Sequence, residues 1–331
     1  MAPAPPIPAP PAAAPGPDRS AAPPRRLSLP EAARALEDGL LVAIPTETVY
    51  GLAAVATQPL AVRQIFAAKG RPVDHPLIVH LADADAAAPY FDRGRSAEAT
   101  AAFDVLAAAF WPGPLTLVVP RGPAALDEVT GGMDTVALRV PAHPLAQSLL
   151  KLLGHGLAAP SANRFGRVSP TTAEHVWEEL GPAQRVLDGG PCAIGVESTI
   201  LDLTEPGGPR LLRQGGLPIE AIEAICGPIP AGARRASGTL AAHYAPRTAL
   251  RLSTAPEAEA EALRAAGLRV GLLRCGPDLD DYARRLYAEL RAMDGLGVDI
   301  LVAEAAPERG LGRAVNDRLR RAVTGSGPAK R

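Results

Sequence analysis

Helix-like and strand-like patterns of apolar residues alternate along the first part of the chain. Ser28 and Glu31 form the S-x-x-E capping box of one predicted helix, and Pro59 and Gly70 bound the next. In all, helices are predicted at residues 28–39, 59–70, 96–110, 143–153, 171–180 and 218–226. Short apolar runs predict strands at residues 40–44, 77–81, 115–119, 136–140, 156–159, 186–187, 196–203 and 210–213. This alternation indicates an α/β sheet with helices packed upon it.

The last part of the chain carries a second, shorter pattern. Strands are predicted near residues 249–252, 269–273 and 298–302, and helices near 257–266, 278–294 and 313–323. A βαβαβα order within about 80 residues is typical of a small parallel sheet. We therefore expect an α/β fold of two domains, the second one Rossmann-like.

Composition separates these domains from the segments around them. Residues 1–26 are almost wholly Ala and Pro, which offer few backbone donors and little bulky apolar surface, so a disordered tail is expected. Residues 227–240 are rich in Pro, Gly, Ala and Ser, which is typical of a linker. The expected plan is a first domain at 27–226, a linker at 227–246, a second domain at 247–323 and a flexible tail at 324–331.

The charge balance limits the class of ligand. The 331 residues are 47% hydrophobic and 21% charged, with a net charge of −1. A protein that coats nucleic acid normally has a basic surface, so we expect any RNA contact to be local or weak. The balance favours an enzyme acting on small molecules.

Cysteine usage and hydropathy indicate a compartment. Cys192, Cys226 and Cys275 lie far apart and form no C-x-x-C pair, so neither a zinc site nor a redox pair is expected. We find no apolar run of the ~18 residues that a membrane span needs, and no signal-peptide pattern. Sparse cysteines fit a reducing environment, and a cytoplasmic location is expected.

Lys69 and Arg71 form the first candidate for chemistry. They flank Gly70 at the end of a predicted helix, and cations at i and i+2 point the same way if the backbone is extended. They would then bind a polyphosphate from one side. The alternative is a solvated basic helix C-terminus, where cations favour the helix dipole.

Other polar residues lie at or within predicted strands. Ser161 and Asn163 follow a buried strand, expected to be parallel to its neighbours, and they share a face. At the end of such a strand they suit phosphate or ribose oxygens, or they form only a local turn. Ser198 would lie on one face of its strand with Val196 and Ile200, so its hydroxyl needs a ligand or a backbone partner. Arg139 ends a strand and suits a carboxylate or a surface ion pair.

Two further positions lie in apolar surroundings. His80 alternates with apolar residues, which is more typical of a satisfied core histidine than of a ligand-binding one. Thr116 follows a rigid W-P-G-P turn and would face a site if one lies there.

Several common catalytic motifs are missing from the sequence. We find no G-x-x-x-x-G-K-[ST] phosphate loop, no G-x-G-x-x-G, no G-x-S-x-G nucleophile elbow and no His/Cys metal cluster. From its residues alone, the chain is a two-domain α/β protein whose strand-end cations and hydroxyls favour anionic ligands. These residues alone do not indicate a particular reaction.

Eight ordered segments resemble the YrdC/Sua5 family, in its longer two-domain Sua5 type of threonylcarbamoyl-AMP synthase. They are PTETVYGL (45–52), AAKGRPVDHPLIVH (67–80), WPGPLTLV (111–118), DTVALRVPAHP (134–144), APSAN (159–163), GVESTI (195–200), LLRQG (211–215) and HYAP (243–246). The segment PERGLGRAVNDRLRRA (307–322) also resembles the end of the second Sua5 domain. The resemblance extends from about residue 27 to residue 323, and together these motifs are highly specific.

The resemblance implies a twisted, open α/β YrdC-like domain with a deep positive cavity, followed by a Rossmann-like domain. It implies roles for these residues. The nucleotide phosphates would be held by Lys69, Arg71, Ser161 and Asn163, with Lys69 and Arg71 as the catalytic clamp. Arg213 and Tyr244 would lie near the nucleotide, with Tyr244 brought in by the linker. Threonine or its carbamoyl group would meet Thr46, His80, Thr116, Arg139 and Ser198.

The implied reaction forms L-threonylcarbamoyl-AMP and pyrophosphate from L-threonine, bicarbonate and ATP. Mg²⁺ would accompany ATP, with no metal ligand from protein side chains. The product would serve N6-threonylcarbamoyladenosine (t6A) at position 37 of ANN-decoding tRNAs, through a downstream tRNA threonylcarbamoyl-transferase machinery. Direct RNA contact would be weak at most, and no membrane contact is expected.

Two departures and two rival interpretations accompany this resemblance. Ala53 replaces a glycine common in the family, and Ser237-Gly238 replaces a Pro-Gly, which bears on the stiffness of the linker. A carbamoyl-adenylate former of the hydrogenase-maturation type is the rival enzyme, but we find no Cys-rich segment of that type. A non-catalytic RNA-binding module is the other rival, and few aromatic residues argue against it.

Overall fold

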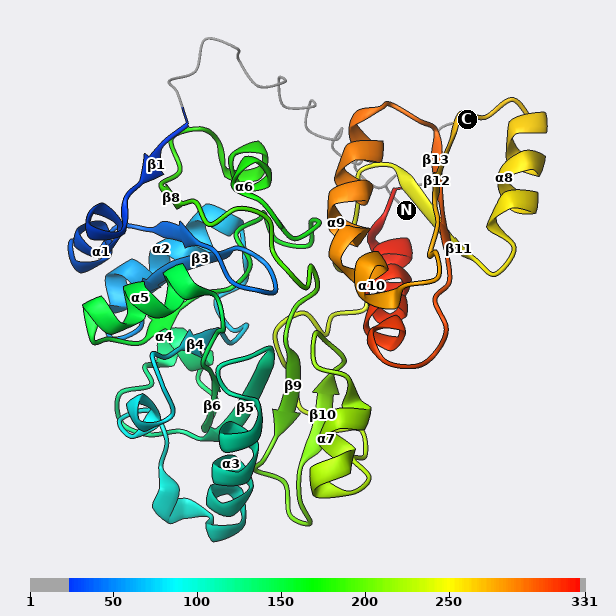
Figure 1. Cartoon of the computed structure of the whole chain (residues 1–331). Coiled ribbons are helices and arrows are strands. Elements are labelled where there is room, and N and C mark those ends of the chain that lie inside the picture. The colour runs from blue at the N-terminus through cyan, green and yellow to red at the C-terminus, as the bar shows by residue number, and fades with distance from the viewer. Residues whose placement is uncertain (1–23, 328–331) are drawn as a thin grey trace, which may run out of the picture.

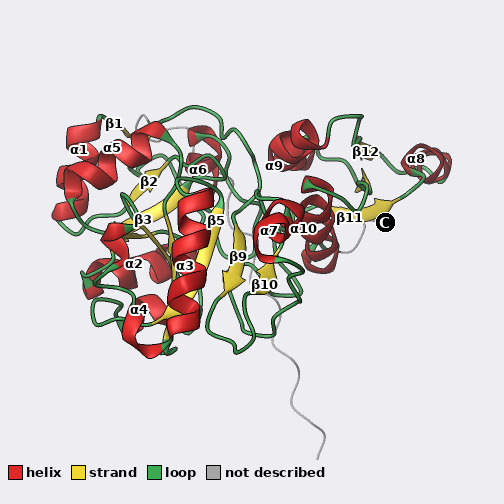
Figure 2. Ribbon diagram, turned by 60° about the horizontal axis from the view of Figure 1, so that its bottom comes forward, coloured by secondary structure: helices red, strands yellow, loops and turns green. Residues whose placement is uncertain are grey.

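The structure, a computed structural model, describes residues 24–327. Figures 1 and 2 show a larger first domain beside a smaller second one, joined by a long connection. The predicted tails at 1–23 and 328–331 lie outside the described residues. Arg26 lies within β1, so this part of the predicted tail belongs to the first domain.

Ten strands of the first domain join into one mixed sheet. Their order is β1 (Arg26–Leu27), β8 (Val186–Leu187), β2 (Val42–Ile44), β3 (Gly51–Val55), β7 (Leu157–Ala158), β4 (Ile78–His80), β6 (Thr135–Arg139), β5 (Leu115–Pro120), β9 (Thr199–Asp202) and β10 (Arg210–Arg213). Strands β4 and β6 run parallel, as do β5 and β9. The carboxyl ends of β4 and β6 therefore meet at one edge.

Helices cover this sheet, and all but the shortest of them were predicted from the apolar pattern. They are α1 (Leu29–Glu37), α2 (Pro59–Lys69), α3 (Ala97–Phe110), α4 (Asp127–Thr130), α5 (Pro144–Leu153), α6 (Ala173–Leu180) and α7 (Ile219–Cys226), with short 3₁₀ turns at Asp85–Ala87 and Arg93–Arg95. The capping box of α1 is present, since the Ser28 amide donates to Glu31 at 2.8 Å. Val42 and Ile44 pack with α1 and α5, while Ala43 between them packs with α2. This alternation is the two-residue period of a strand covered on both faces.

Strand β3 was not predicted from the sequence. Its residues are G-L-A-A-V, and glycine and alanine are depleted in strands, so the local signal is weak. The strand forms because β2 and β7 both pair with it, antiparallel. Two predictions were wrong in detail here. β7 is antiparallel to both neighbours, and β9 begins at Thr199, so residues 196–198 lie outside the strand.

The second domain is the predicted small parallel sheet. Its strands are β11 (Ala249–Ser253), β12 (Val270–Leu273) and β13 (Ile300–Glu304), with β13 between the other two. Helix α8 (Pro256–Ala265) covers one face, and α9 (Leu279–Gly295) and α10 (Leu311–Gly325) cover the face toward the first domain (Figures 1 and 2). α10 runs two residues further at each end than predicted.

The linker between α7 and β11 contains neither helix nor strand, yet it is well anchored. Arg234 forms an ion pair with buried Asp202 at 2.7 Å, and Arg235 pairs with Asp74 at 3.0 Å. The linker therefore lies against the first domain before it reaches the second. Within residues 24–327, no helix has the length and apolar character required to cross a bilayer.

Candidate active site

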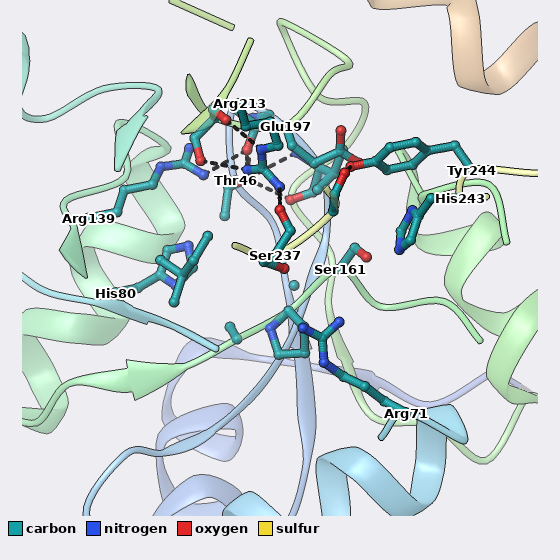
Figure 3. A pocket seen from close by; sticks show the side chains of 18 residues that line it. Thr46, Arg71, His80, Arg139, Ser161, Glu197, Arg213, Ser237, His243 and Tyr244 are labelled. Atoms are coloured by element: carbon teal, nitrogen blue, oxygen red, sulfur yellow. Dashed lines mark hydrogen bonds between the residues drawn. The ribbon is translucent and has the colours of Figure 1, made fainter. Parts of the chain in front are cut away.

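A cavity lies between the ends of the central strands and the linker (Figure 3). Of the site residues predicted from the sequence, it brings together Thr46, Arg71, His80, Arg139, Ser161, Ser198, Arg213 and Tyr244. The predicted residues Lys69, Thr116 and Asn163 do not line it. The cavity contains about 40 Å³ of free space, enough for a few water molecules.

Arg71 projects into this cavity because of the way α2 ends. Gly70 caps the helix in the left-handed conformation, at φ +62°, and so turns the chain out of the helix. The guanidinium donates to the Pro76 carbonyl at 3.0 Å and lies 5.6 Å from the Phe165 ring centroid. Burial, reinforced by nearby Arg213, lowers the pKa of Arg71 to about 10, so it stays cationic at neutral pH. Its Nε has no partner within the described chain.

Lys69 and Asn163 lie behind the wall instead of lining it. The Lys69 ammonium donates to the carbonyl oxygens of Ser161 and Asn163. The Asn163 amide donates to the carbonyls of Arg164 and Arg167, both at 2.8 Å. Lys69 and Arg71 were expected to point the same way if the backbone between them is extended, and left-handed Gly70 means that this condition is not met. Lys69 and Asn163 therefore shape the loop that presents Ser161.

Arg139 lies at the end of β6 in a fully built socket. Its guanidinium forms an ion pair with Glu47 at 2.7 Å and donates to the Thr48 hydroxyl at 2.9 Å and the Gly113 carbonyl at 3.2 Å. The expected alternatives were a ligand carboxylate or a surface ion pair, and the structure shows a buried ion pair. Sequence reasoning missed Glu47 and Thr48, which lie in the same P-T-E-T segment as the predicted Thr46.

His80 and Thr46 lie beside this socket. The parallel register of β4 and β6 places His80 opposite Arg139. Burial, followed by the charge of Arg139, lowers the pKa of His80 to about 3, so the ring is neutral at physiological pH. The Thr46 hydroxyl donates to the Val49 carbonyl at 2.6 Å and thereby fixes the turn that carries Glu47 and Thr48.

Ser198 and Arg213 form the opposite wall. Arg213 donates from Nε to the Ser198 carbonyl at 3.0 Å and from Nη2 to the Ser198 hydroxyl at 3.1 Å. The fully buried Thr116 hydroxyl lies 2.7 Å from the Ser198 hydroxyl, so Thr116 supports Ser198 from outside the cavity. Ser198 thus has protein partners, one of the alternatives that its sequence left open.

The linker closes the cavity from the side of the second domain. Ser237, Gly238, His243 and Tyr244 all line it, and the Ser237 carbonyl accepts from Arg213 at 2.7 Å. Tyr244 is buried in a left-handed backbone conformation, at φ 59°, which is unusual for a residue other than glycine. Burial lowers the pKa of His243 to about 3, and its Nδ1 has no partner among the described residues.

Glu197 is the wall residue that sequence reasoning missed most clearly. It accepts from the Ser169 hydroxyl at 2.6 Å, the Tyr287 hydroxyl at 2.9 Å and Arg318 Nε at 2.7 Å. Burial alone would raise the pKa of Glu197, but Arg318 and Arg213 lower it to about 2. The sequence held one signal for this partnership, since Arg318 lies on the apolar face of α10.

The charge of the cavity is therefore positive. Among the described residues that line it, the charged side chains are Arg71, Arg139, Arg213 and Glu197, and Glu197 is neutralised by Arg318. No group of three or more His, Cys, Asp or Glu side chains in residues 24–327 could hold a metal ion. These residues do not fit a resident Mg²⁺ site. The chain is a two-domain α/β protein whose cavity places buried guanidiniums beside strand-end hydroxyls, an arrangement that suits anionic ligands.

Comparison with known proteins identifies the family of this fold and site. Residues 34–215 match the family model described as "Telomere recombination" (Sua5/YciO/YrdC). Residues 217–324 match the model described as "Threonylcarbamoyl-AMP synthase, C-terminal domain". The threonylcarbamoyl-AMP synthase of Pyrococcus abyssi is 42% identical over 321 residues, covering 88% of this chain and 92% of the relative. That of Bacillus subtilis is 40% identical over 330 residues, covering 89% and 92%.

A solved structure agrees over both domains. The crystal structure of P. abyssi Sua5 complexed with L-threonine superposes with a TM-score of 0.83 at 39% sequence identity, covering 92% of this chain and 98% of that one. The chain belongs to the YrdC/Sua5 family, as an enzyme of the two-domain Sua5 type that transfers an adenylyl group. The resemblance found in the sequence is thereby confirmed, as is the α/β fold of both domains.

Proposed function

We propose that this enzyme joins L-threonine, bicarbonate-derived CO₂ and ATP into L-threonylcarbamoyl-AMP and releases pyrophosphate. The observation that carries the proposal is the buried set of three guanidiniums facing one another across a single cavity. ATP and bicarbonate are anionic substrates, and threonine becomes anionic when its amine is carboxylated. The names of the P. abyssi and B. subtilis relatives support the same activity.

The chemistry asks for alignment and for neutralised negative charge. The uncharged amine of threonine adds CO₂ and loses a proton, which leaves an N-carboxylate. An oxygen of this carboxylate attacks the α-phosphorus of ATP, and the bond to the bridging oxygen of the β-phosphate breaks to expel pyrophosphate. No protein nucleophile is needed, so preorganised cations and donors carry the catalysis.

The residues divide between the two substrates. Arg71 and Arg213 are assigned to the phosphates, and Ser161 lies between their side chains in the view of Figure 3. Arg139 is assigned to the carboxylate of threonine, because Glu47 and Thr48 hold its guanidinium in place before a ligand arrives. Lys69 becomes a positioning residue, since it binds the backbone of the Ser161 loop.

Mg²⁺ is assigned to the substrate and not to the chain. The cavity carboxylate Glu197 already accepts three hydrogen bonds, so the metal would enter on the ATP phosphates. The product would then be passed to a tRNA-modifying transferase for t6A at position 37 of ANN-decoding tRNAs, with at most weak direct contact between this chain and RNA.

Pyrophosphate release tests the proposal directly. We expect release from MgATP only when threonine and bicarbonate are both present, with a large loss when either is withheld. Arg71→Met should lower the rate by about 10²–10³-fold, as for other preorganised groups that stabilise developing charge. Arg63→Met on the exposed side of α2 is the matched control and should leave the rate unchanged. Release that does not depend on threonine would refute the proposal.

A further inference from the structure

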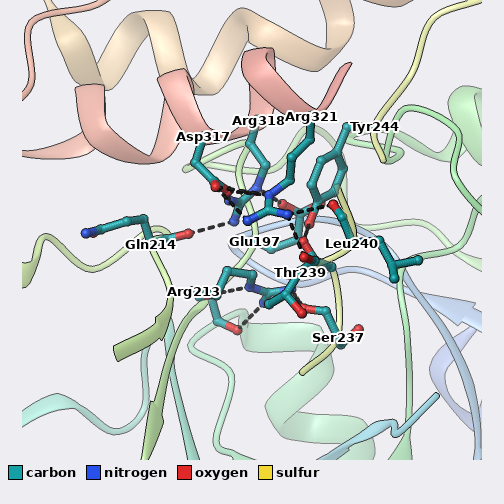
Figure 4. Close-up of polar contacts among 12 residues, drawn as sticks. Glu197, Arg213, Gln214, Ser237, Thr239, Leu240, Tyr244, Asp317, Arg318 and Arg321 are labelled. Carbon is teal, nitrogen blue, oxygen red and sulfur yellow. Dashed lines mark hydrogen bonds and ion pairs between the residues drawn. The ribbon is translucent and has the colours of Figure 1, made fainter. Parts of the chain in front are cut away.

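Helix α10 of the second domain holds the linker that closes the cavity (Figure 4). The Arg321 guanidinium donates from Nη1 to the carbonyls of Thr239 and Leu240, both at 2.6 Å. The backbone carbonyl of the same residue accepts from the His243 amide at 3.3 Å. One residue of α10 therefore attaches the linker immediately after Gly238 and again immediately before Tyr244.

Arg321 is itself held in place before it meets the linker. Asp317, one helical turn earlier, pairs with Arg321 Nη2 at 2.9 Å and accepts from its Nε at 3.0 Å. An i, i+4 pair of this kind restricts the rotamers of a long side chain. The guanidinium is thus already oriented by Asp317 when its remaining N–H groups donate to the two linker carbonyls.

The neighbouring Arg318 attaches the same helix to the cavity wall. It donates to Glu197 at 2.7 Å and to the Gln214 carbonyl at 2.8 Å, and its guanidinium lies 5.0 Å from the centroid of the Tyr244 ring. Glu197 and Gln214 directly adjoin Ser198 and Arg213 in the chain. α10 therefore contacts both the wall of the cavity and the linker that covers it.

We infer that Arg321 is a positioning residue of the active site, supplied by the second domain. It holds residues 239–243 so that Ser237, Gly238 and Tyr244 cover the cavity, while Arg318 keeps the same helix in register with the wall. The second domain thereby contributes to catalysis through the linker, without a residue of its own touching the substrate. The expected effect on kinetics rests on the proposed function, whereas the expected effect on the linker rests on the contacts alone.

Two adjacent arginines allow a matched test in the full-length enzyme. Arg321→Met keeps the length and apolar stem but loses the donors. Arg320→Met removes an exposed guanidinium whose only ion-pair partner within residues 24–327 is Glu308. We expect Arg321→Met to raise amide hydrogen exchange at residues 237–243 by at least about tenfold, with α10 itself unchanged. We expect kcat/KM for pyrophosphate release to fall by about 10–100-fold. Arg320→Met should change neither quantity.

Conservative variants separate positioning from general destabilisation. Arg321→Lys retains donors for the two carbonyls, so it should recover much of the exchange protection and activity. Asp317→Asn frees Arg321 from its orienting charge and should give an intermediate increase in linker exchange. Wild-type exchange at 237–243 in Arg321→Met overturns the inference, and so does raised exchange with an unchanged kcat/KM. If wild-type enzyme releases no pyrophosphate, the proposed function fails, whereas the exchange comparison still decides whether Arg321 holds the linker.

Discussion

Two charged side chains of the cavity wall, Arg139 and Glu197, are buried against an oppositely charged partner from another element. Arg139 at the end of β6 meets Glu47 from the segment before β3, and Glu197 before β9 meets Arg318 from α10. A buried charge without such a partner costs several kcal/mol. The pairs are therefore better understood as preset geometry for a ligand than as a source of stability.

Glu197 should make folding stability depend on pH. Its folded pKa of about 2 lies below the ordinary value of 4.5, so its stabilising effect is present above pH 4.5 and is lost as pH falls toward 2. The shift corresponds to about 3 kcal/mol. In urea unfolding, the stability difference between wild type and Glu197→Gln should be largest near pH 7 and should shrink between pH 4.5 and 2. A difference that stays constant over this window contradicts the assigned charge pair.

Single residues were only partly predictable from the sequence. Arg71, Ser161 and Arg139 line the cavity, and each ends or follows an element that the apolar pattern predicted. Lys69 was expected to hold phosphates with Arg71, but its amine binds the backbone carbonyls of Ser161 and Asn163. The apolar position of Arg318 on α10 signals its burial, but neither its partner nor the role of Arg321 was predictable, because an arginine-rich helix does not show in its sequence which guanidinium meets another domain.

At the scale of elements, the linker between α7 and β11 determines whether the cavity is covered. Gly238 lies in it at φ +76°, and a Cβ there would meet the Tyr244 hydroxyl at 2.1 Å and Arg213 Nη1 at 2.8 Å. Both the backbone conformation and the close approach require glycine. The family's Pro-Gly is replaced by Ser237-Gly238, so this chain retains the residue that the geometry demands.

Gly238→Ala should therefore displace the linker without unfolding the domains. We expect kcat/KM for pyrophosphate release to fall by about tenfold or more, because a strained cover costs of the order of 1–3 kcal/mol. Thermal unfolding should change little. Ala241→Ser, at an exposed position of the same linker, is the control. Wild-type kinetics in Gly238→Ala would show that the covered state plays no part in turnover.

Elements with strong periodicity were predicted well, and those defined by partners were not. The capped helices α1 and α2 and the strands β11 to β13 follow directly from local pattern. Strand β3 is rich in small residues and forms only because β2 and β7 flank it. Strand direction was also invisible in the sequence, which is why β7 was expected to be parallel.

At the scale of the whole molecule, the two domains share a polar and an apolar interface. Arg291 of α9 pairs with Glu179 of α6 at 3.2 Å, and both side chains are 9% exposed. Val49, Val168 and Val196 of the first domain pack into the core of the second. This degree of burial predicts that the domains unfold together.

Arg291→Ala should uncouple them. It leaves Glu179 largely buried without its cation, at a cost of about 3 kcal/mol. Both tryptophans, Trp111 and Trp177, lie in the first domain, so their fluorescence follows that domain while circular dichroism follows the whole chain. We expect the two urea transitions to coincide in wild type and to separate in Arg291→Ala. Arg274→Ala, which removes an exposed pair within the second domain, should leave them coincident.

The small volume inside the covered cavity has a consequence for timing. About 40 Å³ of free space is far below the roughly 300–1,000 Å³ of typical ligand pockets. Under the proposed function, residues 237–244 would therefore have to move aside before ATP enters and again before the adenylate departs. Each catalytic cycle then includes two movements of this segment, and the rate of these movements sets an upper limit on kcat. Raising the viscosity of the solvent should therefore lower kcat, even though the chemical step is unchanged.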